Sequence, residues 1–128
     1  MQFVYKPEGA EPKRWDFVPE KMMSVECIEI ERRTGWDFGE WLERFKRANM
    51  GAIHAYLYVM LKRELPGVKY DDVRFCLDDV AFEPSPDELS EARARLEEKR
   101  DGDGLDDGEA AMLAKLIKDG VEMPAPKD

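Results

Sequence analysis

Few side chains in this sequence have the types and spacing that catalysis requires. The only histidine, His54, has the chemistry of a general base, and Cys27 and Cys76 have that of nucleophiles. His54 lies in the most apolar stretch of the chain, which favours an interior histidine held by one hydrogen bond. Neither cysteine has a neighbouring motif that would lower its thiol pKa. We therefore predict reduced core cysteines, a structural histidine and a protein that is not an enzyme.

Carboxylates are abundant, but their spacing fits no metal site that we recognise. Three adjacent pairs fall in predicted turns rather than on rigid elements: Asp71-Asp72, Asp78-Asp79 and Asp106-Asp107. A calcium loop starting at Asp101 needs an oxygen ligand, a glycine and a glutamate where this chain has Leu105, Asp106 and Met112. One histidine and two cysteines are too few for a zinc site. We predict an acidic hinge over residues 101–108, with no metal and no cofactor.

The stretch "TGWDFGEW", residues 34–41, is typical of a joint between two helices. Gly35 suits the left-handed position that ends a helix, and Asp37 suits the N-cap of the next one. Glu40 then occupies the position that completes a capping box, while Trp36 and Trp41 occupy the two positions of a hydrophobic staple. These five residues are predicted to be structural. The alternative is that the aromatic rings bind a ligand or a partner.

Helical periodicity surrounds this joint. A helix is predicted from Pro19 or Glu20 to Arg33, with one apolar stripe: Met22, Val25 and Ile28. After the joint, a second helix has an apolar face: Phe38, Trp41, Leu42, Phe45 and Ala48. Asn49 can cap a third helix, whose residues 52–61 are apolar at nine of ten positions, so it should lie at the centre of the core. Residues 73–77 alternate as in a short strand.

The predicted fold is mainly α, divided into three parts. Residues 1–13 form an extended N-terminal arm, 14–83 form a small helical core with a short extended or β segment, and 84–128 form an acidic arm. This arm has two short helices and a disordered end. Its apolar side chains are predicted to bind a partner by lying in a groove, or alternatively to fold back on the core: Leu89, Leu96, Met112, Leu113, Leu116 and Ile117.

The charge distribution restricts the possible partners. The net charge is -9, and residues 67–128 hold 18 Asp/Glu against 9 Lys/Arg, whereas residues 1–66 are balanced. An acidic surface repels phosphates, so we predict no nucleic-acid binding. The chain has no apolar run of the roughly 20 residues that a membrane span needs and no leader-like N-terminus, so we predict a cytosolic protein without membrane contact. An acidic inhibitor or nucleic-acid mimic that binds a basic protein is one functional hypothesis.

A second hypothesis comes from the order of several short motifs. Trp15-x-Phe17-x-Pro19-x-Lys21 is followed by Ile28-Glu29-Ile30-Glu31-Arg32 and Thr34-Gly35-Trp36. An apolar helix then ends in Leu61-Lys62-Arg63 before Pro66, and Asp71-Asp72-Val73-x-Phe75 follows. Across residues 14–77 this order resembles the tail assembly chaperones of long-tailed bacteriophages, especially those of actinobacterial hosts.

The resemblance implies a small, mostly helical, non-enzymatic chaperone that binds the tape measure protein during tail assembly. It implies action in the host cytoplasm and absence from the mature virion. Such chaperones are commonly also made as a longer, frameshifted form that recruits the tail tube protein. A Pro-Lys dipeptide can be encoded by a slippery heptamer, and Pro126-Lys127 stands near the end of the chain. Self-association is a further option that the sequence leaves open.

Overall fold

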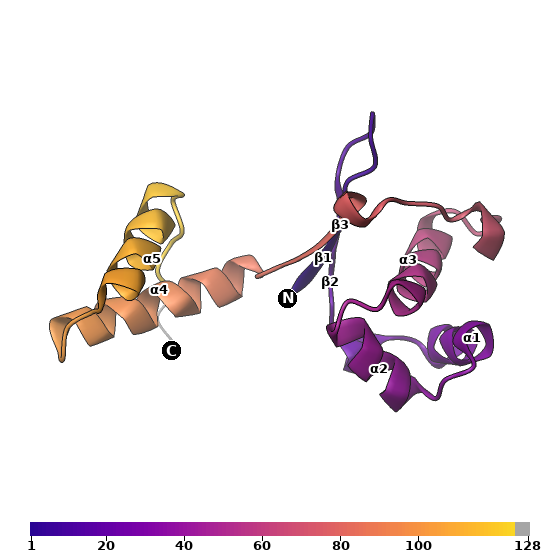
Figure 1. Cartoon of the computed structure of the whole chain (residues 1–128), viewed down its shortest axis with the longest axis horizontal. Helices are drawn as coiled ribbons and strands as arrows, with labels where there is room; N and C mark the ends of the chain where they lie inside the picture. The colour runs from indigo at the N-terminus through magenta and orange to yellow at the C-terminus, as the bar shows by residue number, and fades with distance from the viewer. Residues whose placement is uncertain (125–128) are drawn as a thin grey trace.

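A computed structural model describes residues 1–124 of the chain. It consists of a small sheet covered by three helices, from which a two-helix arm projects (Figure 1). The mainly α character predicted from the sequence is confirmed. Pro126-Lys127, on which the frameshifting hypothesis rests, lies outside the described residues.

The sheet has three antiparallel strands in the order β2-β1-β3. These are β1 (Gln2–Tyr5), β2 (Lys13–Asp16) and β3 (Val80–Glu83). Phe3 pairs with Trp15 on one side and with Phe82 on the other, so aromatic rings from all three strands meet on one surface. This surface packs against the helices because it is the apolar side of a half-buried sheet.

The prediction of a separate N-terminal arm over residues 1–13 is wrong, because strand β1 belongs to the core. Phe3 and Val4 are fully buried, and β1 is the central strand of the sheet. The breaks at Pro7 and Gly9 form the connection to β2 rather than a linker outside the core. The short apolar run at residues 3–5 carried too little periodicity to reveal its two partner strands, since these lie at opposite ends of the core sequence.

Three helices form the other layer of the core. They are α1 (Ser24–Thr34), α2 (Phe38–Lys46) and α3 (Met50–Glu64). The apolar density of α3 correctly indicated its central place, because most of its side chains from Ala52 to Met60 are buried. A single 3-10 turn, η1 (Pro19–Lys21), precedes α1, so the first predicted helix begins about four residues too early.

The segment between α3 and β3 differs from the predicted strand at residues 73–77. It contains two 3-10 turns, η2 (Tyr70–Asp72) and η3 (Leu77–Asp79). The Cys76 backbone N–H donates to the Asp79 carboxylate over 2.8 Å, which closes the second turn. The strand therefore starts at Val80, and Phe82 supplies the ring that meets Phe3 at 5.6 Å between centroids.

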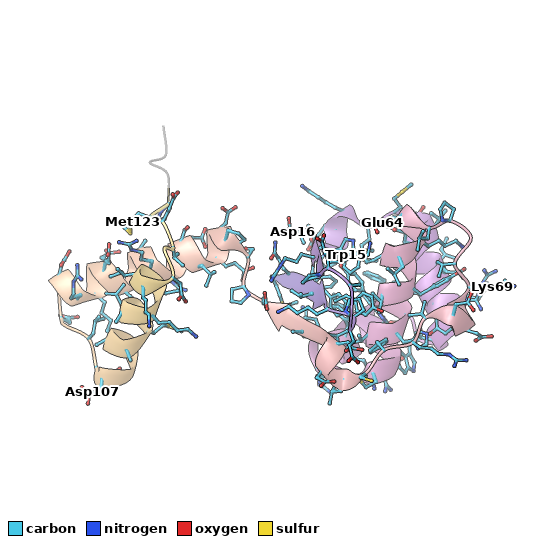
Figure 2. All side chains as sticks on the ribbon, turned by 90° about the horizontal axis from the view of Figure 1, so that it is seen from above. Trp15, Asp16, Glu64, Lys69, Asp107 and Met123 are labelled. Carbon is cyan, nitrogen blue, oxygen red and sulfur yellow. The ribbon has the colours of Figure 1, made fainter. Side chains whose placement is uncertain are left out.

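The arm comprises α4 (Pro86–Asp101) and α5 (Asp107–Lys118), joined through the predicted acidic hinge. Ser85 and Asp106 cap these helices by accepting hydrogen bonds from the backbone N–H groups of Glu88 and Glu109. Side chains crowd the core, whereas the arm forms a second, thinner lobe (Figure 2). The arm thus folds as a helical hairpin beside the core instead of covering it.

Candidate interaction surfaces

The structure places the six predicted partner-binding residues in the arm but gives them different roles. Leu113 and Leu116 are buried in the hairpin, at 3% and 7% exposure. Leu89 and Leu96 of α4 are half-buried. Met112 and Ile117 remain 57% and 44% exposed. The arm therefore uses part of its apolar surface to fold on itself and leaves the rest available to another molecule.

The exposed pair lies on two different sides of α5. At about 100° per residue, Met112 and Ile117 flank the buried Leu113–Leu116 stripe, one on each side. The hairpin is further closed by Lys99, whose ammonium lies 2.8 Å from the Glu109 carboxylate. Arg93 also donates to the Val121 carbonyl. These contacts hold α5 on α4 and present two separate apolar edges.

A second apolar surface, which the sequence did not indicate, lies on α1. Met23, Val25 and Ile28 are 64%, 64% and 59% exposed. Of the predicted stripe, Met22 packs against the core, whereas Val25 and Ile28 are exposed because Glu26 and Ile30 occupy the buried side of α1. Arg63 of α3, 37 residues further along the chain, binds Glu26 and so turns this face of α1 inward. No local pattern could have revealed such a distant partner.

Beside this exposed face, a cleft of about 340 Å³ runs between α1 and α3. Val59 is its most buried lining residue, and Lys62 and Arg63 line its α3 side. The lining residues on the α1 side are Met23, Val25, Glu26 and Glu29. These seven residues together form what we call the α1–α3 cleft.

The carboxylates of the α1–α3 cleft are both held by arginines. The Arg63 guanidinium donates two hydrogen bonds to Glu26, at 2.6 and 2.7 Å. These bonds lower the pKa of the Glu26 carboxyl, and partial burial opposes them only in part. Glu29 accepts hydrogen bonds from Arg32 at 2.5 Å and from Arg33 at 2.9 Å. Both carboxylates are therefore paired with arginines of the same chain.

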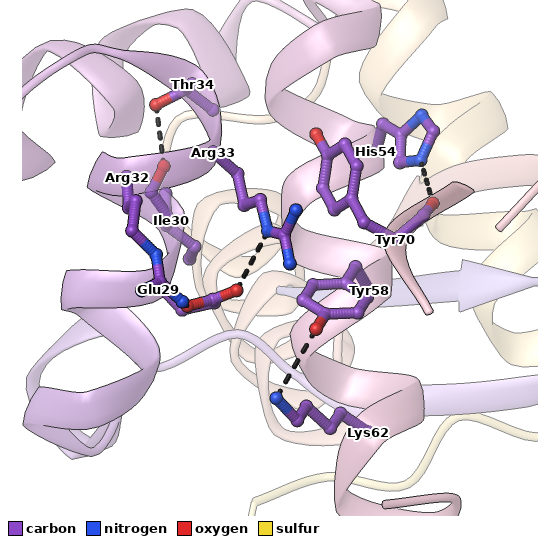
Figure 3. A network of polar contacts seen from close by, with 9 residues as sticks. All are labelled: Glu29, Ile30, Arg32, Arg33, Thr34, His54, Tyr58, Lys62 and Tyr70. Atoms are coloured by element: carbon purple, nitrogen blue, oxygen red, sulfur yellow. Dashed lines mark hydrogen bonds and ion pairs between the residues drawn. The ribbon is translucent and has the colours of Figure 1, made fainter. Parts of the chain in front are cut away.

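Arginine and tyrosine side chains join α1 to α3 next to the cleft (Figure 3). The Arg33 guanidinium lies 5.5 Å from the ring centroid of Tyr58 and 5.1 Å from that of Tyr70, within cation–π range. Lys62 donates to the Tyr58 hydroxyl over 3.3 Å. Within residues 1–124, no carboxylate pairs with Lys62. The cleft therefore has an ammonium group at its rim with only a phenol as partner.

The joint at residues 34–41 matches most of its predicted roles. Gly35 has φ of 77° and ends α1, and the Glu40 backbone N–H donates to Asp37 over 2.7 Å. Trp41 is fully buried and donates through Nε1 to the Ala52 carbonyl over 3.0 Å. Trp36 is half-buried, and the guanidinium of Arg44 lies 4.3 Å from its ring centroid.

Two details of the predicted joint differ. Glu40 does not complete a capping box, because its carboxylate pairs with Arg44 at 3.0 Å. Glu31, from the preceding helix, instead accepts a hydrogen bond from the backbone N–H of Phe38, the first residue of α2, over 2.9 Å. Trp41 pairs with the rings of Phe38 and Phe45, whereas no ring pair joins it to Trp36 within residues 1–124, so the predicted staple between the two tryptophans is not seen.

The residues considered for catalysis differ in their surroundings. His54 donates through Nε2 to the Tyr70 carbonyl over 3.1 Å and stacks on the Tyr70 ring, as expected for an interface histidine. Cys27 is half-buried, and burial raises the pKa of its thiol. Cys76 is exposed, which corrects its prediction as a core residue. Within residues 1–124, no cluster of three or more His, Cys, Asp or Glu residues could hold a metal ion.

Comparisons with protein-family models, curated proteins and solved structures find no match for this chain. The resemblance to tail assembly chaperones therefore rests only on the motifs within residues 14–77. No helix among the described residues is both long and apolar enough to span a membrane.

Proposed function

We propose that this protein is a non-enzymatic chaperone of bacteriophage tail assembly, which binds the tape measure protein in the host cytoplasm. The order of motifs in residues 14–77 supports the family. The arm supports the mode of action, because it is a helical hairpin outside the core with apolar side chains left uncovered. Such a hairpin can lay its free edge against an amphipathic helix of a long partner.

The observation that carries this proposal is the partial burial of the arm's apolar residues. Leu113 and Leu116 close the hairpin, while Met112 stays exposed on one edge and Leu89 and Leu96 stay half-buried on α4. A hairpin that served only to complete the fold would pack these side chains on the core. Burying them on a partner would remove apolar area from water, which is favourable.

Coexpression tests the proposal directly. The chain is produced together with the tape measure protein that the proposal requires, and the amount of soluble partner and its co-purification are measured. We expect the partner to become soluble and to co-purify. Met112→Gln should weaken co-purification, whereas Leu77→Glu, a change at a 69% exposed residue of the core, should not. If neither solubility nor co-purification responds to the chain, the chaperone function is wrong.

The longer form is tested at the level of the gene. A slippery heptamer near the codons for Pro126 and Lys127, with an overlapping −1 frame, would support a frameshifted product that recruits the tail tube protein. Mass spectrometry of infected cells would show the extended chain. A gene without the heptamer and the overlapping frame would exclude this form and leave the short form's binding to the partner as the whole function.

The charge of the arm favours one second candidate, an acidic inhibitor or nucleic-acid mimic that occupies a basic cleft of another protein. Residues 84–128 contain 13 Asp/Glu and 7 Lys/Arg. The two functions differ in their response to salt, because screening weakens contacts between exposed charges far more than apolar contacts. Binding to the tape measure protein that persists at about 1 M salt, where the Debye length is about 3 Å, would support the chaperone.

A further inference from the structure

A second cleft of the core, of about 250 Å³, lies between the end of β2, the turn η1 and α3. Tyr56, Met60 and Arg63 recur at helical spacing and line it from α3. Asp16 lines it from β2 and Lys21 from η1. We call this space the β2–α3 cleft. It is smaller than the about 300 to 1,000 Å³ of pockets for drug-sized ligands, so its occupant must be a small molecule.

Tyr56 is the buried polar residue of the β2–α3 cleft. It is 1% exposed, and its ring is held by Phe45 and Phe3 at centroid distances of 4.7 and 5.2 Å. Within residues 1–124, its hydroxyl makes no hydrogen bond to the protein. Burial raises the pKa of the phenol to about 12, with opposite effects from Arg63 and Asp16, so the hydroxyl lies near both and keeps its proton at pH 7. A fixed donor without a partner favours an acceptor on a bound molecule.

Charged groups of both signs line the same cleft. Lys21 has no ion-pair partner among the described residues, and Asp16 accepts only a hydrogen bond from Gln2, at 3.2 Å. Arg63 donates to Glu26 through Nε and one Nη, which leaves its other Nη group without a partner in that part of the chain. When the pair of Arg63 and Glu26 is counted as neutral, one unpaired cation and one unpaired carboxylate remain. The cleft therefore has no net charge but can bind groups of either sign.

The rest of the lining is apolar, because Met60 is 1% exposed and the half-buried Val18 and Met22 complete it. We propose that the β2–α3 cleft binds a small zwitterionic amino acid with an apolar side chain. Its carboxylate accepts from the Tyr56 hydroxyl and lies near Lys21, while its ammonium pairs with Asp16. A simple anion would add negative charge beside Asp16, and a simple cation would add positive charge beside Lys21. This inference does not rest on the proposed function, because the arm takes no part in the cleft.

Titration of the full chain with L-valine, followed by two-dimensional amide NMR, tests the proposal. Two analogues of the same shape each lack one charge, since isovalerate has no ammonium and isobutylamine has no carboxylate. Tyr56→Phe removes the hydroxyl and keeps the ring, so the fold should be preserved. Lys21→Met is a second variant, at an exposed residue whose replacement should not affect folding. Tyr58→Phe is the matched control, because Tyr58 is also buried on α3 but its hydroxyl accepts from Lys62 outside this cleft.

L-Valine should shift the amide signals of the lining residues until they saturate, with a dissociation constant on the order of 1 mM for so small a ligand. Tyr56→Phe and Lys21→Met should each raise that constant about tenfold, and Tyr58→Phe should leave it unchanged. Isovalerate and isobutylamine should each bind at least about tenfold more weakly than L-valine. The proposal would be overturned by the absence of saturable shifts up to about 50 mM L-valine, by equal binding of either analogue, or by equal binding to Tyr56→Phe.

Discussion

The core and the arm of this protein are held together by different kinds of side chain. Every Trp, Tyr and Phe lies within residues 3–82, and the arm has none. In the core, Phe45 lies within 4.7 to 5.9 Å of the rings of Phe3, Phe17, Trp41, Tyr56 and Phe82, measured between centroids. The arm is held together instead by two buried leucines, by helix caps and by ion pairs.

This difference separates a region that buries its apolar side chains from a region that leaves several of them exposed. Aromatic rings bury a large apolar area per residue and set precise contacts, so the core gains most of the folding free energy. The arm gains little, because it buries few side chains and its exposed ion pairs contribute about 0 to 1 kcal/mol each. Its remaining apolar edges are available for binding. Substitutions in each region test this division.

Replacing Trp41 with Ala should lower the free energy of unfolding by about 3 to 5 kcal/mol. The ring is fully buried, stacks on Phe45 at 5.0 Å, and its Nε1 donates to the Ala52 carbonyl. Urea unfolding followed by circular dichroism measures the change. Trp36→Ala is the matched control, because Trp36 is only half-buried, and it should cost much less. Equal losses at both positions would show that the joint depends on the pair of tryptophans.

Replacing Leu113 with Ala should destabilise the arm by about 2 to 4 kcal/mol while leaving the core unchanged. Leu113 is 3% exposed in a hairpin with few other buried side chains, so its loss should open α4 and α5. Hydrogen exchange measures the effect as lost amide protection confined to residues 86–118. Met112→Ala, at the neighbouring exposed residue, should preserve protection. Lost protection in α3 would contradict the independence of the two regions.

Replacing Glu26 with Gln should lower stability near pH 7 by about 1 to 2 kcal/mol, a modest value because Arg63 is about half exposed. The Arg63 hydrogen bonds hold the folded pKa of Glu26 below its ordinary value of 4.5. The contribution is therefore complete above about pH 4.5 and is lost as the pH falls through the folded pKa. Urea unfolding across acidic pH should show the native chain and the variant converging. A constant difference at all pH values would contradict this origin.

Replacing Asp37 with Ala should cost about 1 kcal/mol, because Asp37 accepts the capping hydrogen bond from Glu40. Glu40→Ala should cost less, about 0.3 to 0.5 kcal/mol, since its carboxylate only pairs with Arg44 on an exposed helix surface. Thermal unfolding compares the two variants. A larger loss at Glu40 would indicate the reciprocal capping bond that the structure lacks.

Local chemistry was sufficient to predict several parts of the fold. The left-handed Gly35, the caps at Asp37 and Asn49 and the burial of α3 follow from residue types within one or two helical turns. The acidic hinge and both arm helices also follow from local glycine, aspartate and apolar spacing. These features depend on backbone groups near the residue concerned, so the order of amino acids contains the necessary information.

Features formed by residues far apart in the chain required the tertiary structure. Strand β1 became the centre of the sheet only because residues 13–16 and 80–83 pair with it from both sides. The ion pair of Glu26 with Arg63 turned Val25 and Ile28 outward and created the α1–α3 cleft. In the arm, packing on α4 decided that Leu113 and Leu116 are buried while Met112 and Ile117 are not. The amino-acid order specifies which side chains are apolar, whereas the contacts between distant segments decide which of them remain exposed.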